Sequence, residues 1–483
     1  MIWINSHLPI LQIVLSLFGA LLSTVSFNKR IAYVIATFIV ACCLIISIYV
    51  FQNTDELGYE LGGWQAPIGI EYRLDFVNSP LFILVNGPLL FLLVFCKEPI
   101  EDTVLAFITE DRQHLFFSCL LFAHTGFLGM ISTNDLFNFY VFIEISSLSV
   151  YVLMAQGGNK YKARGAFDYL IIGSIGATLI LIGIGFLLSL TGSLNITDIK
   201  ERLAGAHDSK ILITASCFII IGIFLKMAFF PLHFWMVRAY RSAPCVILIY
   251  LASISSVIGT YCYLRVTHFV LDYDTTLLSL GNFLKPLALI AILACGYLAL
   301  RASKLKDIMI YSAASQTGYI VFLLSLGKCN SLIFQFIITD LVSKISLFLI
   351  CAKYEQTRVR TSSLENGFII VTLICSAGLP LSGMFIAKIN ILELLFAKDY
   401  LIESIVIIIG STAGLLYYYR MARILLSNEG REKVESFNFN TENIGMICLL
   451  LLQIYMIGSQ NWINKYHLWE PGLFKHSSKT TVK

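Results

Sequence analysis

Charged residues are scarce in this chain. They make up 13% of its 483 residues, whereas 57% are hydrophobic, and the mean hydropathy is +0.80. A soluble protein of this length has too little interior to bury so much apolar surface, so most of that surface is expected to face lipid. The net charge of +4 is small and forms no basic stripe along the chain, which excludes nucleic acid as a partner.

Motifs for metals, disulfides and nucleotides are also missing. The twelve cysteines lie mostly in apolar runs and include no C-x-x-C pair, so zinc sites, iron–sulfur clusters and a disulfide framework are not indicated. Neither G-x-G-x-x-G nor G-x-x-x-x-G-K-[ST] occurs, so nothing indicates that this chain itself binds a nucleotide. We expect no metal and no cofactor, and packing roles for the cysteines.

The N-terminal region lacks charge altogether. Residues 1–28 contain no Lys, Arg, Asp or Glu, whereas a secretory signal peptide begins with a positively charged region. The apolar stretch from Leu8 to Phe27 is long enough to span a bilayer. We therefore expect a retained first membrane helix.

What the chain has instead is a succession of long apolar runs. Runs of this length span a bilayer as helices, and the sequence predicts an all-α polytopic membrane protein with about fourteen of them. The expected limits are 8–28, 31–51, 79–96, 114–132, 134–155, 166–191, 211–236, 243–266, 283–300, 307–327, 330–352, 367–397, 401–424 and 441–460. The longest connection, 52–78, contains LGGWQAPIG, which predicts a tight interfacial loop or hairpin. No linker divides the chain, so residues 1–483 are expected to form a single integral membrane domain.

Lysine and arginine are distributed unevenly between the connections. Those that follow odd-numbered spans carry nineteen, and those that follow even-numbered spans carry eight. Cytoplasmic loops are enriched in these residues. We therefore expect the odd-span connections in the cytoplasm and both termini outside it, in the cell (inner) membrane.

Three lysines lie well inside predicted spans, away from the span ends, and two of these spans contain a proline. Lys226 precedes Pro231 in the seventh span, Lys388 follows Pro380 in the twelfth, and Lys344 lies in the eleventh. A charge at the bilayer centre costs about 2.5–3.5 kcal/mol on insertion scales, so each lysine indicates a function or a partner. A proline within a span breaks or kinks the helix, and the freed backbone groups are tolerated only within protein or a wet cavity.

The spacing of the two interrupted spans predicts an internal repeat. They are five spans apart, and an odd offset inverts the orientation of the second unit. The sequence therefore predicts two inverted five-helix repeats, at about 114–266 and 283–424, with the first three helices and the last one outside them. Paired broken helices are typical of transporters built in this way.

Glu144 lies deep in the fifth span, with serines beside it. A buried carboxylate is either protonated or paired with a cation, and Lys226 on a neighbouring helix is a candidate partner. A weakened pair could release or take up a proton; the alternative is a static bridge that fixes helix packing. We favour the proton-carrying role, because packing alone does not require charges in the bilayer.

Further ionisable groups extend this set. Asp340 and Lys344 lie four residues apart, on one helix face, where they can neutralise each other. Lys306 opens the tenth span and either snorkels to the interface or starts a hydrated path. His233, beyond the first break, either relays protons or caps freed backbone groups, whereas His124 is expected to be a packed, hydrogen-bonded histidine. The resulting lateral chain for protons contains Glu144, Lys226, Lys306 or Lys344, and Lys388.

Four stretches together resemble a known family. NDLFNFYVFIEISSLSVYVL, FLKMAFFPLHFW, LKDIMIYSAASQTGY and SAGLPLSGMFIAK are similar, in this order, to the proton-conducting antiporter-like subunits shared by respiratory complex I and the Mrp-type multisubunit cation/proton antiporters. ELGGWQAPIGIEY and GSLNITDI most resemble the D subunit of the Mrp type. The resemblance covers nearly the whole chain and implies fourteen helices, inverted repeats of five, and a central hydrophilic axis. It gives Glu144 and Lys226 the essential positions of the fifth and seventh helices, and matches Lys306 and Lys388 to basic positions of the tenth and twelfth.

The chain departs from this family at three places. Val257 stands where the eighth helix has a lysine, Met236 begins a stretch that replaces Leu-Pro-Asp, and Asp340 stands where a histidine is common. One link of the axis is therefore missing. The chain conducts by a shortened route, relies on Asp340 and Lys344, or has lost conduction.

The sequence thus predicts a membrane subunit of a cation/proton (Na⁺/H⁺) antiporter that conducts protons along buried lysines and glutamate, with no chemistry of its own. One alternative is a proton-pumping membrane subunit of NADH-quinone oxidoreductase (complex I). Another is a non-conducting scaffold subunit, which Val257 favours and the buried lysines disfavour. The expected partners are other subunits of a hetero-oligomeric assembly, the lipid bilayer, H⁺ and Na⁺.

Overall fold

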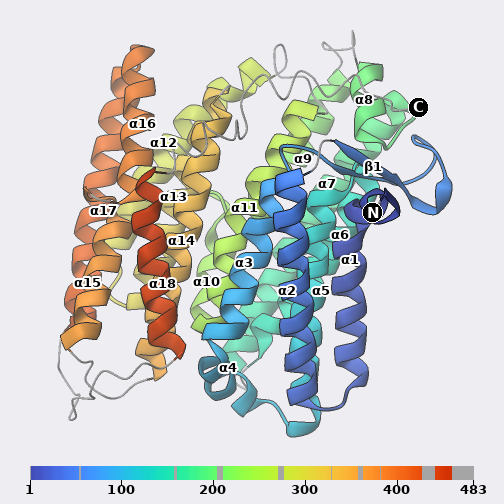
Figure 1. Ribbon diagram of the computed structural model, residues 1–483. Helices are drawn as coiled ribbons and strands as arrows, with labels where there is room; N and C mark the ends of the chain where they lie inside the picture. The colour runs from blue at the N-terminus through green and yellow to red at the C-terminus, as the bar shows by residue number, and fades with distance from the viewer. Residues whose placement is uncertain are drawn as a thin grey trace.

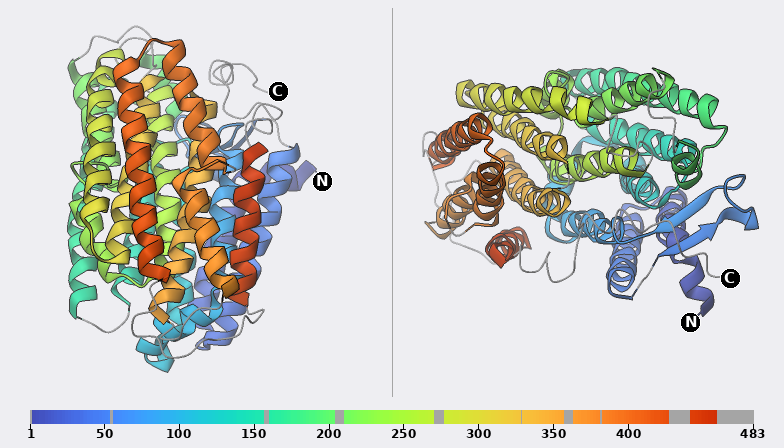
Figure 2. Two further views of the ribbon diagram at one scale, coloured as in Figure 1. Left: turned by 90° about the vertical axis from the view of Figure 1, so that its left-hand side faces the viewer. Right: turned by 90° about the horizontal axis from the view of Figure 1, so that it is seen from above.

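Helices lie side by side in this protein and form a bundle (Figures 1 and 2). The computed structural model describes residues 2–53, 56–156, 160–203, 210–269, 277–327, 329–356, 363–380, 382–426 and 441–458. Its α-helices are α1 (Ile2–Val25), α2 (Lys29–Asn53), α3 (Ser79–Phe95), α4 (Lys97–Thr103), α5 (Gln113–Ser132), α6 (Leu136–Ala155), α7 (Lys160–Thr191), α8 (Ile196–Leu203), α9 (Lys210–Lys226), α10 (Phe234–Ser242), α11 (Cys245–Phe269), α12 (Leu277–Arg301), α13 (Leu305–Leu326), α14 (Asn330–Gln356), α15 (Ser363–Ala377), α16 (Gly383–Ala397), α17 (Leu401–Leu426) and α18 (Thr441–Tyr455).

The expected spans coincide with these helices. Eleven helices of the described ranges are long and apolar enough to cross a membrane, or twelve spans if the bent pair that begins with α3 is counted as one. The expected spans 211–236 and 367–397 are each occupied by two short helices, α9 with α10 and α15 with α16. The chain is therefore a multi-pass helical membrane protein, as predicted. Residues 459–460 of the last expected span lie outside the described residues.

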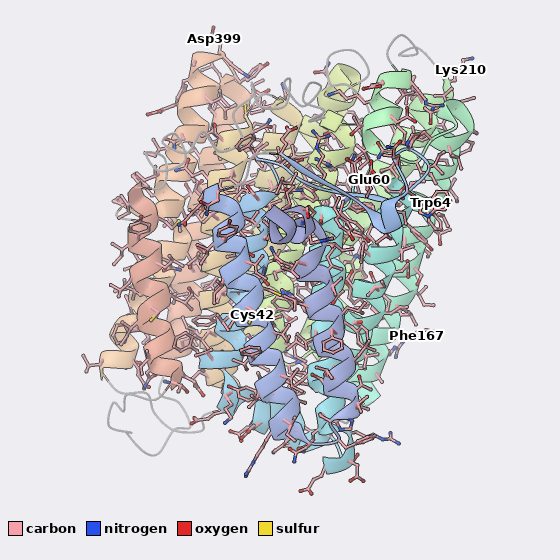
Figure 3. All side chains as sticks on the ribbon, turned by 45° about the vertical axis from the view of Figure 1, so that its right-hand side comes forward. Cys42, Glu60, Trp64, Phe167, Lys210 and Asp399 are labelled. Carbon is pink, nitrogen blue, oxygen red and sulfur yellow. The ribbon has the colours of Figure 1, made fainter. Side chains whose placement is uncertain are left out.

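Successive spans alternate in direction. The connections after odd-numbered spans gather at the end of the bundle that carries α4, at the bottom of Figure 1. Glu60, Lys210 and Asp399 mark the opposite end in Figure 3. The bundle thus separates the lysine-rich and arginine-rich connections from the others, and the assignment of the α4 end to the cytoplasm stays a prediction. The last residues of the C-terminus, 459–483, lie outside the described residues.

Burial differs strongly between inner and outer helices. The most apolar stretch of α14 is buried throughout, whereas only a third of that of α2 is. Large apolar side chains such as Phe38 of α2 and Ile402 of α17 are exposed, and Phe167 of α7 points outward in Figure 3. Apolar side chains on an outer surface are expected where lipid replaces water. α11, α13 and α14 form the interior of the bundle.

The connection 52–78 forms the expected hairpin. Strands β1 (Leu57–Glu60) and β2 (Glu71–Leu74) pair antiparallel, with Leu57 opposite Leu74. Buried polar contacts fix the hairpin to the bundle. Nη1 of Arg265 in α11 lies 2.7 Å from Oδ2 of Asp75, and Nη2 donates to Oδ1 of Asn134 at 3.0 Å. This buried ion pair links the hairpin to an inner helix.

The first three helices join the rest of the bundle through a buried hydrogen-bond network. His124 of α5 bonds the Tyr250 hydroxyl of α11 through Nδ1 at 2.7 Å and Oδ1 of Asn86 in α3 through Nε2 at 2.8 Å. The Asn86 amide group donates to Gln12 of α1 and Ser47 of α2, so its oxygen faces His124 as an acceptor. His124 is fully buried and hydrogen-bonded on both sides, which confirms the predicted packing role.

Candidate functional site

Both expected helix breaks are present, and they have the same backbone structure. α9 ends at Lys226, and Ala228 follows with φ of 52°. The Ala228 amide donates to the Leu225 carbonyl at 3.2 Å, and the Phe229 amide donates to the Phe224 carbonyl at 3.0 Å. This pair of bonds is the Schellman motif, in which one left-handed residue closes a helix.

The second break repeats this pattern. α15 ends at Ala377, and Gly378 follows with φ of 80°. The Gly378 amide bonds the Cys375 carbonyl at 3.2 Å, and the Leu379 amide bonds the Ile374 carbonyl at 3.3 Å. Pro231 follows the left-handed Ala228 by three residues, and Pro380 follows the left-handed Gly378 by two. Matching capping at both breaks supports the predicted repeat.

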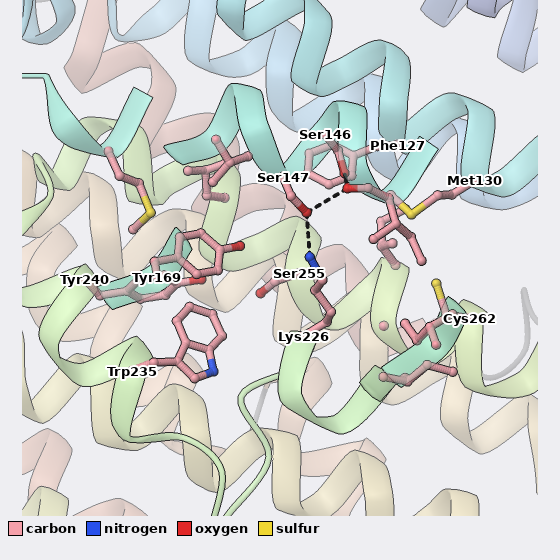
Figure 4. Close-up of a pocket in the computed structure, with 18 residues that line it drawn as sticks. Phe127, Met130, Ser146, Ser147, Tyr169, Lys226, Trp235, Tyr240, Ser255 and Cys262 are labelled. Carbon is pink, nitrogen blue, oxygen red and sulfur yellow. Dashed lines mark hydrogen bonds between the residues drawn. The ribbon is translucent and has the colours of Figure 1, made fainter. Parts of the chain in front are cut away.

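Lys226 lies at the first break and points into a cavity. Its Nζ donates to Oγ of Ser147 in α6 at 2.7 Å, and Ser147 in turn donates to the Ile143 carbonyl at 2.7 Å (Figure 4). The cavity is lined by residues of α5, α6, α7, α9, α10 and α11 and offers about 80 Å³ to the centres of water molecules. By that measure one water needs about 10–15 Å³. Several waters therefore fit beside the ammonium.

Glu144 and Lys226 do not form an ion pair in the part of the chain that the structure describes. Glu144 lies one helical turn before Ser147 on α6 and is half-buried. Its carboxylate is near enough to Lys226 to act on the ammonium through space. The structure therefore brings the two residues to neighbouring positions, with Ser147 as the direct partner of the lysine.

α11 separates this cavity from a second polar site. Ser255 lines the Lys226 cavity, whereas the next residue, Ser256, faces α14. Ser256 Oγ donates to Oδ2 of Asp340 at 3.1 Å and accepts a bond from Nζ of Lys344 at 3.1 Å. Two consecutive serines of one helix thus face the polar sites on its two sides, and Ser256 is bonded to both charged groups of its site.

Asp340 and Lys344 form the pair that their spacing predicts. The Lys344 ammonium lies 2.6 Å from Oδ2 of Asp340, and the two side chains are 6% and 1% exposed. A small cavity beside the pair is also lined by Gln316 of α13 and Tyr418 of α17, and it offers about 10 Å³ to water centres, which is room for one water. Within the described residues, Oε1 of Gln316 is buried without a hydrogen-bond partner, so it can accept a bond from such a water.

Lys388 lies beyond the second break. Its Nζ donates to the Ala377 carbonyl at 3.3 Å, at the end of α15, and lies 5.6 Å from the ring centre of Tyr319. Ala377 is the last residue before the interruption, so Lys388 satisfies a carbonyl that the break releases. At the first break Nε1 of Trp235 donates at 3.0 Å to the Leu225 carbonyl, which also accepts a bond from the Ala228 amide.

Lys306 and His233 lie outside the Lys226 cavity and outside the cavity beside the Asp340–Lys344 pair. Lys306 Nζ donates to the Ala243 carbonyl, between α10 and α11, and its neighbour Asp307 pairs with Arg241 at 2.7 Å. Lys306 therefore lies at the end of the bundle, beside the α10–α11 junction. His233 is buried among the rings of Phe230, Phe234 and Tyr311, and its side chain makes no capping bond to α10. The structure does not bring it into the Lys226 cavity.

Sequence reasoning missed the serines that contact the lysines. Ser147, Ser255 and Ser256 are not among the predicted site residues, although Ser147 stands close to Glu144 in a polar stretch and the serine pair immediately precedes Val257. Serines inside a span are common packing residues, so their presence alone gives no signal. In the described ranges no group of three or more His, Cys, Asp or Glu could hold a metal ion. The arrangement is suited to passing protons between hydroxyls, ammonium groups and water.

The chain is similar to several known proteins. Residues 133–416 match the family model described as NADH:quinone oxidoreductase/Mrp antiporter, transmembrane region. The N subunit of the NADH-quinone oxidoreductase of Desulforudis audaxviator is 30% identical over 437 residues, 86% of each chain. The D subunit of the Na⁺/H⁺ antiporter of Alkalihalophilus pseudofirmus is 25% identical over 480 residues, 94% of this chain and 93% of the relative. A chain of the Mrp complex from a Dietzia species has the same fold, with a TM-score of 0.85 at 16% identity over 98% of both chains.

Proposed function

This chain belongs to the family of antiporter-like membrane subunits of NADH:quinone oxidoreductases and Mrp antiporters, and from that premise we propose that it is a proton-conducting subunit of a multisubunit cation/proton antiporter. Na⁺ is the first cation to test. The observation that carries the proposal is a pair of lysines on the two sides of α11, one buried and one half-buried. Each is bonded to a serine, and one lies beside a cavity that has room for water.

The proposed route has four parts. Protons reach Lys226 through the cavity, with Glu144 as a nearby carboxylate acceptor. They pass α11 at Ser255 and Ser256, since a hydroxyl both donates and accepts hydrogen bonds. Beyond α11 they meet the Asp340–Lys344 pair and then, through the small cavity beside Gln316, the region of Lys388.

Val257 bears on this route because it replaces the lysine that the family resemblance places in the eighth helix. Its side chain is fully buried in α11. The adjacent Ser256 holds Lys344 of α14 at the same level of the bundle. We propose that Lys344 supplies the missing cation from the neighbouring helix, which makes the Asp340–Lys344 pair part of the route.

The test measures antiport in everted membrane vesicles from cells that express the complete complex. Glu144→Gln and Lys226→Ala are each expected to lower Na⁺-induced proton movement by at least tenfold, because each removes a group that carries a proton. Lys304→Gln is the control, since Lys304 is exposed at the α13 start. Antiport that survives in both site variants at the control level excludes the proposed role.

The complex I alternative has its own supporting observation, the 30% identity to an N subunit of NADH-quinone oxidoreductase. The longer coverage by the D subunit of the antiporter favours the antiporter, as does the hairpin stretch LGGWQAPIG. Purification of the assembled complex discriminates the two. Flavin and iron–sulfur subunits that copurify in stoichiometric amount would assign the chain to an oxidoreductase.

A non-conducting scaffold is the third candidate, and Val257 is the observation that favours it. A scaffold predicts unchanged complex assembly and unchanged transport for Lys226→Ala and for Lys344→Ala combined with Asp340→Asn. It also predicts that Val257→Lys creates transport where none existed. A conducting subunit predicts reduced transport in the Lys226 and Lys344 variants and no gain of transport from Val257→Lys. A lysine inserted into the packed core beside Lys344 adds like charge and overpacks the site.

A further inference from the structure

A second hollow lies at the α4 end of the bundle, far from the lysines of the proposed route in sequence. It is lined by residues of α2 and α4, with Leu105 and with Phe117 of α5, and it offers about 470 Å³ to the centres of water molecules. This is several times the room beside Lys226. Nothing in the proposed proton route uses it.

The hollow carries an excess of positive charge. Lys29, Arg30 and Lys97 line it, against a single carboxylate, Glu101. Among the described residues none of these four forms an ion pair; Lys97 instead lies 5.1 Å from the ring centre of Tyr33. An unpaired cluster of this kind indicates an anionic ligand.

The start of α2 adds to this positive charge. Its first turn contains no acidic residue and begins with Lys29 and Arg30. Free amides at a helix N-terminus already carry a partial positive charge, so acidic residues are the usual stabilising choice there. Two cations at this place add to that partial charge, so an anion in front of them would interact favourably with both.

The remaining acidic side chains of α4 lie elsewhere. Glu98 and Asp102 are near Glu442 of α18, and neither lines the hollow. Of the three acidic side chains of α4, only Glu101 lines the hollow, against three cations.

The walls of the hollow are apolar. Val34, Ile100, Leu105 and Phe117 complete its lining. Along the same helix, Val34 and Phe38 are exposed by 61% and 65% on an outer surface that faces lipid. The hollow and the adjoining face of α2 thus fit a ligand whose anionic head contacts the basic side chains and whose apolar tail contacts the apolar ones.

The position of the hollow fits the polar boundary of a membrane. The segment Lys97–Phe107, which contains α4, is bent by 77° from α3, so it runs across the end of the bundle rather than along it (Figure 1). This end also carries the excess of lysine and arginine. Basic pockets between membrane helices on that side of a protein bind the headgroups of anionic lipids.

We propose that this hollow binds an anionic phospholipid, with the phosphate between Lys29, Arg30 and Lys97 and an acyl chain along Val34 and Phe38 of α2. The proposal is independent of the proposed transport function. It concerns only the charge and shape of the α4 end of the protein.

The test measures thermal unfolding and lipid binding of the full-length purified protein in mild detergent. The probes are dioleoylphosphatidylglycerol, dioleoylphosphatidylcholine and inorganic phosphate. The anionic lipid is expected to raise the melting temperature and to remain bound in native mass spectrometry, and the zwitterionic lipid is not. Equal stabilisation by the two lipids overturns the proposal. If saturating inorganic phosphate raises the melting temperature and the anionic lipid does not, the ligand is phosphate and not a lipid.

Variants locate the site. Lys29→Gln combined with Lys97→Gln is expected to weaken binding of the anionic lipid roughly thirtyfold, since each basic residue near an anionic lipid contributes about 1 kcal/mol and 1.4 kcal/mol is tenfold. Arg301→Gln combined with Lys304→Gln removes two charges from the same end outside the hollow and is expected to bind as wild type. Lys29→Arg combined with Lys97→Arg keeps the charge and is expected to retain binding, which separates a lost site from a misfolded protein. Equal weakening in the site and control variants overturns the proposal.

Discussion

Two lysines flank α11, and their surroundings differ. Lys344 is 6% exposed and lies 2.6 Å from the Asp340 carboxylate, with Ser256 bonded to both. Lys226 is half-buried, lines a cavity, and has a neutral hydroxyl as its hydrogen-bond partner. One cation is therefore held in a closed ion pair, and the other faces space that water can fill.

This difference separates two requirements of a proton route in lipid. A closed pair is stable because its charges cancel, but a proton can leave it only when the pair is broken. A lysine beside water and without an ion pair exchanges its proton more readily, because the water solvates the charge. We infer that substitutions on the Lys344 side act mainly on stability and those on the Lys226 side mainly on transport.

The largest expected effect comes from removing the Lys344 ammonium. Lys344→Met leaves Asp340 buried without a cation, which is expected to lower the free energy of unfolding by about 3–5 kcal/mol. Chemical denaturation of the purified protein in detergent measures it. Lys226→Met is the matched variant and is expected to change stability by much less, since it breaks no ion pair. Equal losses of unfolding free energy in the two variants would show that the ion pair of Lys344 does not make it more important for stability than Lys226.

A rescue sharpens the same comparison. Asp340→Asn added to Lys344→Met removes the uncompensated charge and is expected to recover most of the lost stability. A double variant as unstable as Lys344→Met alone would mean that the lysine acts through packing, and not through the carboxylate.

The next effect concerns transport through the Lys226 cavity. Ser147→Ala removes the hydroxyl that Lys226 bonds, an interaction with a charged group of about 1.5–3 kcal/mol, so antiport in vesicles is expected to fall about tenfold. Ser146→Ala is the control, because Ser146 lines the same cavity and, like Ser147, donates to the Ile143 carbonyl, whereas Lys226 donates to Ser147. Identical activity of the two variants would remove Ser147 from the route.

The serine pair of α11 gives a smaller and more local test. Ser256→Ala deletes hydrogen bonds to Asp340 and Lys344 and is expected to lower the free energy of unfolding by about 1–3 kcal/mol. Ser255→Ala deletes a bond to a carbonyl of its own helix and breaks none to a charged group, so it is expected to change the free energy of unfolding by less than about 0.5 kcal/mol. Chemical denaturation of both variants measures the two losses, provided that the free energy of unfolding falls with denaturant at the same slope in both. A larger loss for Ser255→Ala than for Ser256→Ala would contradict the assignment of Ser256 to the side of the Asp340–Lys344 pair.

The smallest expected effect lies at the first helix break. Trp235→Phe keeps an aromatic ring that can stack on Tyr169 but removes the indole N–H that bonds the Leu225 carbonyl. A loss of about 0.5–1.5 kcal/mol is expected, as for one hydrogen bond. Stability unchanged in this variant would mean that the bond from the Ala228 amide alone satisfies the Leu225 carbonyl.

The sequence predicted those features that depend on neighbours along the chain. Apolar runs located the spans, Pro231 and Pro380 located the breaks, and the four-residue spacing of Asp340 and Lys344 predicted their pair. Each of these signals is local, because helix periodicity and backbone geometry act over a few residues.

Contacts between helices were not predictable in the same way. The sequence indicated Glu144 as the partner of Lys226, but the rotation of α6 against α9 brings Ser147, one turn further, to the ammonium. Likewise Lys306 bonds the Ala243 carbonyl, and a main-chain acceptor has no signature in sequence. Charge type indicates that a lysine needs a partner, whereas the packing angle of the helices selects it.

The C-terminal end of α9 has one more consequence. A helix ends with partial negative charge on its last carbonyl groups, and a cation there is stabilised by up to about 2 kcal/mol in partly buried places. Lys226 is itself the last residue of α9, so the interrupted helix supplies a fixed electrostatic complement for its ammonium. A dipole built into the main chain cannot be protonated, unlike a carboxylate. In the proposed route, the break therefore gives the lysine a counter-charge that stays constant during proton transfer.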